Sequence, residues 1–153
     1  MKRETSTLST WLPVILWTMI IAIESTYGSA ANTGWLFQKL STWLFGHMDP
    51  AHFKIFHHIL RKSGHFLGYG MFGYLWFRAF MRTFASNTPL MWAAVAIAST
   101  FFIASLDEWH QSFSPRRTGE FKDVALDTGG ALVFVSLAMA AVARRRKTII
   151  AST

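Results

Sequence analysis

The ionisable residues that could bind a ligand or catalyse a reaction are concentrated in two stretches of this chain, 58–69 and 107–127. The second stretch holds five of the eight acidic residues, although the flanking segments 93–106 and 131–143 contain no charged residue. Ionisable groups at the ends of apolar helices are costly unless they pair or contact water, and they therefore indicate a functional site.

In the first stretch, one face of an expected helix carries four side chains that can exchange protons or bind anions. They stand at i, i+4, i+7 and i+11 and are His58, Lys62, His65 and Tyr69. Lys62 would supply a positive charge, His65 a proton donor or acceptor near neutral pH, and Tyr69 a hydroxyl. The alternative is structural, with Lys62 and His65 at headgroup depth and Tyr69 in an aromatic belt. The shared face beside small residues favours a ligand site.

The second stretch begins and ends with carboxylates at helical spacing. Asp107 and Gln111 are i and i+4, and Glu108 is adjacent to Asp107. Asp123 and Asp127 are also i and i+4, at the start of the next apolar segment. We expect these side chains to face the first stretch across a polar pocket. The structural alternative is that Asp107 or Asp127 pairs with a basic residue, Lys62, Arg116 or Arg117, and holds the helices together.

The sequence assigns no metal site and no cofactor. HExxH does not occur, and the spacing of His57, His58 and His65 is not a specific ligand pattern. A hard cation bound by carboxylates is the alternative that the composition leaves open. Catalytic serine triads, phosphate loops and dinucleotide fingerprints are also absent, and the lack of cysteine excludes disulfides and thiolate metal sites.

The composition identifies an integral membrane protein. Hydrophobic residues make up 52% of the chain and aromatic residues 16%, which is high for a soluble domain. We predict a single domain, 1–153, that is an all-α bundle of four transmembrane helices. The four spans are expected near 8–27, 63–80, 90–106 and 124–143.

The segment between the first two predicted spans, about 32–61, is intermediate in polarity. Its apolar residues at helical spacing include Trp35 and Trp43, which predicts a helix lying at the membrane interface. Gly46 to Pro50 should separate this helix from the next, with Asp49 as the N-cap and Pro50 as the first helical residue.

The net charge of +7 is distributed as expected for a membrane protein and does not indicate nucleic-acid binding. Basic residues occur mainly at the ends of apolar segments, and 144–147 is an uninterrupted basic cluster. The positive-inside rule therefore predicts that both termini are cytoplasmic and that the polar pocket faces outward. A cleaved signal peptide is the alternative for the first apolar segment, but its length, its tryptophans and Glu24 favour a retained helix.

Two motifs in order resemble those of VanZ-like membrane proteins. Lys62-Ser63-Gly64-His65-Phe66 with Tyr69 resembles the K-xx-HF-xx-Y segment of that family. The later residues resemble its DE-xx-Q, PGR and D segments, with Asp107-Glu108, Gln111, Pro115-Arg116-Arg117 and Asp123-Val124. The resemblance covers about residues 55–140. Arg116 stands where the family has glycine, so Arg117 takes the position of the motif arginine.

The resemblance implies a small multi-pass protein of the bacterial cytoplasmic membrane, related to one associated with low-level resistance to the glycopeptide teicoplanin. It implies no mechanism. The expected partners are membrane lipids and, further, a lipid-linked envelope precursor or a glycopeptide, but not nucleic acid.

Together, the motifs and spacing give a functional hypothesis with named roles. The protein is expected to bind or modify an envelope component, either an anionic lipid headgroup or a lipid-linked wall precursor. The candidate catalytic residues are His65, Asp107 and Glu108, because histidines and desolvated carboxylates can act as general bases. The candidate ligand-binding residues are Lys62, Tyr69, Gln111, Arg117, Asp123 and Asp127. The alternative is an accessory membrane subunit without catalytic activity, in which these charges hold the bundle together.

Overall fold

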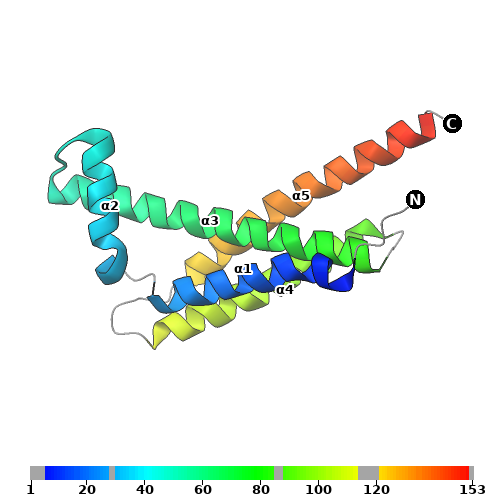
Figure 1. The fold of residues 1–153 in the computed structure, drawn as a ribbon, viewed down its shortest axis with the longest axis horizontal. Helices are drawn as coiled ribbons and strands as arrows, with labels where there is room; N and C mark the ends of the chain where they lie inside the picture. Colours follow the sequence, from blue (N-terminus) through cyan, green and yellow to red (C-terminus); the bar gives the residue numbers. More distant parts are fainter. Residues whose placement is uncertain (1–5, 28–29, 85–87, 114–120, 152–153) are drawn as a thin grey trace.

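The computed structural model of the chain describes residues 6–27, 30–84, 88–113 and 121–151. Within these residues the regular structure is entirely α-helical, which confirms the all-α class. The helices, shown in Figure 1, are α1 (Thr7–Tyr27), α2 (Ala30–Phe45), α3 (Pro50–Thr83), α4 (Pro89–Ser112) and α5 (Phe121–Ala151).

Three of these helices are long and apolar enough to cross a membrane, so the chain is a membrane protein. The segments are Thr7–Thr26, Pro89–Ser112 and Phe121–Arg145, and they contain or overlap the predicted spans 8–27, 90–106 and 124–143. The fourth predicted span, 63–80, lies within α3, which is not among the three. The glycines, tyrosines and His65 of segment 63–80 lower its mean hydropathy. A bundle of four transmembrane helices is therefore not confirmed.

The predicted boundary between the second and third helices is confirmed. Gly46 adopts a φ of 78°, a left-handed conformation that favours glycine, directly after α2 ends. The Asp49 side chain accepts hydrogen bonds from the backbone N–H groups of Ala51 and His52, and Pro50 is the first residue of α3. The side chain of His52 also bonds to Asp49 and lowers the pKa of that carboxyl.

The long helix α3 is the centre of the fold and packs against each of the other four helices. The indole N–H of Trp11, near the start of α1, donates to Thr83 Oγ1 at the end of α3 over 3.0 Å. Farther along α1, Trp17 donates to the Gly68 carbonyl over 2.9 Å. These two contacts show that α1 and α3 run antiparallel. Figure 1 shows α2 against the other end of α3.

The helices α3 and α5 approach each other most closely at a pair of glycines. A Cβ atom on Gly130 would lie 2.2 Å from the carbonyl oxygen of Phe66, and one on Gly70 would lie 2.7 Å from the Phe134 ring. Gly73 is similarly close to Ala131. Small residues therefore permit this crossing, as they do between membrane helices generally.

Gly64 and Gly68, two further glycines of α3, lie in more open surroundings. A Cβ atom on Gly64 or Gly68 would meet no atom within 4 Å. The two pairs of glycines lie on different faces of α3. Gly70 and Gly73 face α5, whereas Gly64 and Gly68 lie on the side toward α1, where Trp17 donates to the Gly68 carbonyl.

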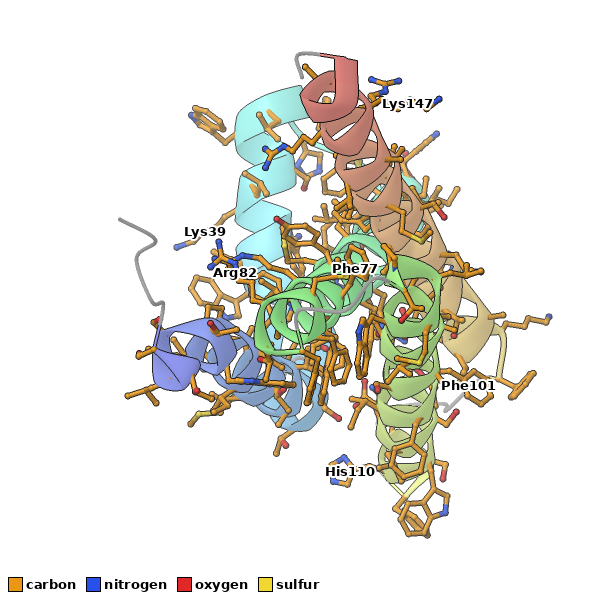
Figure 2. The ribbon with its side chains drawn as sticks, turned by 90° about the vertical axis from the view of Figure 1, so that its right-hand side faces the viewer. Lys39, Phe77, Arg82, Phe101, His110 and Lys147 are labelled. Carbon is orange, nitrogen blue, oxygen red and sulfur yellow. The ribbon has the colours of Figure 1, made fainter. Side chains whose placement is uncertain are left out.

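Part of the interior of the bundle is aliphatic and aromatic, and much of the outside is apolar as well. Phe72 is fully buried, and Phe77 lies between the helices with 2% of its surface exposed. Figure 2 shows Phe77 at the centre of the assembly, whereas Phe101 points away from α4. Outward-facing leucines and phenylalanines are expected where lipid rather than water surrounds a helix.

Gly130→Ala should destabilise the protein by about 1–3 kcal/mol, because the added methyl group would overlap the backbone of Phe66. Gly129→Ala is the matched control, since a Cβ there meets nothing within 4 Å and alanine favours the helix. Unfolding of the purified protein in detergent measures both variants. Equal stabilities would contradict the close crossing of α3 and α5.

Candidate functional site

Polar side chains from three helices meet inside the bundle, toward the end where α4 finishes and α5 begins. All seven are buried, with exposed fractions between 0% and 8%: His65, Tyr69, Asp107, Glu108, Gln111, Asp123 and Asp127. On α4 and α5 these polar residues share a face with buried alanines. Ala104 precedes Asp107 by one turn, and Ala131 follows Asp127 by one turn. The predicted face-to-face arrangement of the two stretches is therefore present.

Tyr69 and Asp107 connect α3 to α4. The Tyr69 hydroxyl donates to Asp107 Oδ2 over 2.8 Å, and both residues are more than nine-tenths buried. A hydroxyl donor stabilises a carboxylate that has lost its water, although it adds no positive charge. The Tyr69 ring also stacks on His65, with 6.2 Å between the ring centroids.

His65 and Asp127 connect α3 to α5. His65 Nδ1 lies 3.4 Å from each oxygen of Asp127. Asp127 is fully buried, and the imidazole can either donate a proton toward it or carry a positive charge beside it. This pairing fixes the orientation of the His65 ring and points its second nitrogen, Nε2, away from Asp127.

Asp123 is paired with two basic residues at the edge of the buried cluster. Lys62 Nζ contacts Asp123 Oδ1, and Arg61 Nη2 lies 3.6 Å from Asp123 Oδ2. Lys62 therefore pairs with Asp123 and not with Asp107 or Asp127, the partners considered from the sequence. Both basic side chains are about one-quarter exposed, which places them where the cluster meets its surroundings.

Three of the buried residues could hold a metal ion. One nitrogen of His65 and one oxygen from each of Glu108 and Asp127 all lie within 4.8 Å of one another. Histidine with two carboxylates is a donor set that divalent metals accept.

A cavity of about 360 Å³ lies on the other side of α3, against α1 and α2. Its apolar wall includes Trp17, Ile20 and Phe37, and its polar groups include Glu24 and Arg61. His65 and Tyr69 line it as well, so these two residues border both the cavity and the carboxylates. Gly64 and Gly68 lie along its α3 side, where the lack of side chains leaves the space open.

Arg61 supplies a permanent positive charge among the residues that line this cavity. His57 also lines the cavity, but burial lowers its pKa, and the nearby charges of Arg61 and His58 lower it further. A neutral imidazole at neutral pH can still donate or accept a hydrogen bond. The guanidinium of Arg61 is therefore the cavity's group for binding a carboxylate or a phosphate.

Reasoning from the sequence missed Arg61 and included His58 in the wrong set. His58 is exposed and is not part of the buried cluster. The sequence spacing could have identified Arg61, because His57, Arg61 and Gly64 stand at i, i+4 and i+7. They form a second helix face next to the one that carries His65. The sequence alone does not show which of two adjacent faces of a helix meets the polar cluster, because that depends on the helices packed against each face.

Arg117, a predicted ligand-binding residue, lies outside the described residues, as does Arg116. The other predicted site residues are described, and the structure places Lys62, His65, Tyr69, Asp107, Glu108, Gln111, Asp123 and Asp127 in or beside the buried cluster. Whether any of them binds a ligand stays a prediction.

Comparison with known proteins gives one finding about the family. A family model described as VanZ/LLP1 matches residues 10–143, which include most of α1 and all the residues of the buried cluster. Neither the curated proteins nor the solved structures gave a match to this chain.

Tyr69→Phe should cost about 1–3 kcal/mol of stability, because it removes the hydrogen-bond donor from a buried carboxylate. Tyr74→Phe is the control, since Tyr74 lies one and a half turns farther along α3 and is only partly buried. Thermal unfolding in detergent compares the two variants with the wild type. If Tyr69→Phe unfolds no earlier than Tyr74→Phe, the bond to Asp107 contributes nothing.

Proposed function

Because the chain belongs to the VanZ/LLP1 family, we propose that it is a multi-pass protein of the bacterial cytoplasmic membrane that binds or modifies a lipid-borne component of the cell envelope. The ligand class is a phosphate-bearing lipid headgroup or a lipid-linked wall precursor. A link to glycopeptide tolerance rests on the family alone, since no contact among the described residues bears on an antibiotic.

The observation that carries this proposal is the cavity between α1, α2 and α3. It combines an apolar wall with a guanidinium at one place, which suits a ligand with a hydrocarbon part and an anionic part. Arg61 would bind the phosphate, and Glu24 would accept a hydrogen bond from a hydroxyl or amine of the headgroup. Trp17, Ile20 and Phe37 would contact the acyl or prenyl chain.

The proposed topology has 63–80 of α3 as a fourth crossing. This topology is supported by the contacts of Trp11 and Trp17, which make α3 antiparallel to α1, so that α3 would return through the layer that α1 would cross. Both termini would then be cytoplasmic, with the basic cluster 144–147 beside anionic lipid. The cavity and the carboxylates would lie toward the outer face.

The helix α2 would lie at the outer interface. Trp43 is 80% exposed and Trp35 61% exposed, and Leu36, Leu44 and Phe45 are exposed on the same helix. Tryptophan is enriched where a membrane meets water, because its ring is apolar and its N–H is polar. In this position α2 would border the route by which a lipid enters the cavity.

If the bound component is also modified, His65 is the residue placed to act on it. It lines the cavity and contacts the buried Asp127, which would stabilise the imidazolium formed when His65 accepts a proton from a ligand hydroxyl. Glu108 and Asp107 would be the further candidates, reached only through the interior of the bundle.

Gly64→Leu should reduce co-purified lipid at least tenfold while leaving the fold intact. A side chain at this position extends into the cavity, and its Cβ meets no atom within 4 Å. Gly129→Leu is the matched control, because its Cβ is equally unobstructed and it does not line the cavity. Native mass spectrometry of protein extracted gently from membranes would identify the retained lipid.

Two results of this experiment would contradict the proposal. One is wild-type protein that carries no lipid or precursor at all. The other is equal retention by Gly64→Leu and the wild type when both have the same unfolding temperature.

The second candidate function is structural, and the contacts of Asp123 favour it. Lys62 and Arg61 both pair with this carboxylate, as expected if the charges join α3 to α5. Lys62→Asp combined with Asp123→Lys should then restore stability that either single variant loses, and should also restore the cellular phenotype. A ligand site requires the original charges, so recovered stability without recovered function would count against the structural role.

A further inference from the structure

The cluster of His65, Glu108 and Asp127 lies in the interior of the bundle, one residue from each of α3, α4 and α5. These residues have exposed fractions of 7%, 6% and 0%. Their donor atoms lie within 4.8 Å of one another, and His65 Nδ1 is already 3.4 Å from Asp127. Three helices thus place one nitrogen and two oxygen donors for a metal ion close together.

The cluster brings several buried carboxylates close to one imidazole. The Tyr69 hydroxyl bonds to Asp107, and the Tyr69 ring stacks on His65, which contacts Asp127. Lys62 and Arg61 contact Asp123 instead. Carboxylates gathered beside an imidazole in this way form a donor set that divalent cations accept.

Several buried polar atoms around this point have no hydrogen-bond partner in the described part of the chain. They are His65 Nε2, Asp107 Oδ1 and both amide atoms of Gln111. Gln111 is 1% exposed, and it follows Glu108 by one turn of α4. Unsatisfied buried groups cost about 1–3 kcal/mol each, so a set of them at one place indicates a bound species that satisfies them.

We propose that His65, Glu108 and Asp127 bind a divalent transition-metal ion such as Zn²⁺ or Mn²⁺ in the interior of the bundle. The imidazole favours such an ion over Mg²⁺ or Ca²⁺, which prefer oxygen donors throughout. Metal–ligand distances of about 2.0–2.2 Å require the donor atoms to approach to roughly 3–4 Å. Rotation of the Glu108 side chain can supply this movement.

Three protein donors would leave coordination positions free for water, as at catalytic zinc sites. Asp107 and Gln111 would then hydrogen-bond that water, which would account for their unsatisfied atoms. The ion would bind whether or not a lipid occupies the neighbouring cavity, so this inference goes beyond the proposed function.

The test uses the full chain purified in detergent with a tag that contains no histidine, stripped with a chelator and titrated calorimetrically with Zn²⁺, Mn²⁺ and Mg²⁺. Zn²⁺ or Mn²⁺ should bind at one ion per chain, at least tenfold more tightly than Mg²⁺. Electron paramagnetic resonance of bound Mn²⁺, with ¹⁵N-labelled histidine, should show coupling to one imidazole nitrogen.

Single substitutions show which side chains bind the ion. Glu108→Gln and His65→Gln should weaken Zn²⁺ and Mn²⁺ binding at least tenfold and abolish the rise in unfolding temperature that the ion gives the wild type. Asp49→Asn is the control, because it also removes one carboxylate next to a histidine, but in the exposed pair with His52. It should bind the ion like the wild type.

Three outcomes would overturn the proposal. They are the absence of stoichiometric binding by the wild type, equal binding by Glu108→Gln, and loss of binding in Asp49→Asn alone, which would assign the ion to the surface pair. The wild-type titration and resonance spectrum decide the question even if a variant fails to fold. Gly64→Leu changes no metal donor. The proposals of lipid binding and of metal binding can therefore be contradicted separately.

Discussion

The close crossing of α3 and α5 is the contact on which the rest of the structure depends. Because Gly130 has no side chain, the backbone of α5 can lie against the Phe66 carbonyl of α3. The two helices run in the same direction, and their contacts follow in order on one side of the crossing, with Lys62 beside Asp123 and then His65 beside Asp127. A bulkier residue at 130 would separate both pairs, since the pairs share the same interhelical distance.

The crossing of α3 and α5 also buries charged groups in the interior. Four carboxylates from α4 and α5 are buried where water is excluded, and a buried charge is stable only with a partner. Asp123 has two basic partners, Asp127 has an imidazole, and Asp107 has the Tyr69 hydroxyl. Among these three, Asp123 has the most positive charge beside it, whereas Asp107 has a neutral donor.

The helix α3 separates two environments and connects them through two residues. One of its faces meets the carboxylates of α4 and α5, and another meets the cavity beside α1 and α2. His65 and Tyr69 lie at the border and take part in both. The imidazole and the phenol therefore connect the carboxylate cluster directly to the lining of the cavity.

The sequence by itself determined the helices, the boundary at Gly46 to Pro50 and most members of the polar cluster. These follow from local rules, because helix periodicity, capping and the cost of charge in an apolar segment are properties of neighbouring residues. The tertiary structure alone decided that Lys62 pairs with Asp123, that Arg61 borders a cavity, and that Gly64 and Gly68 face open space while Gly70 and Gly73 face a helix. Those outcomes depend on the rotation and relative offset of helices that are distant in sequence. Packing sets both quantities, and no spacing within one helix can encode them.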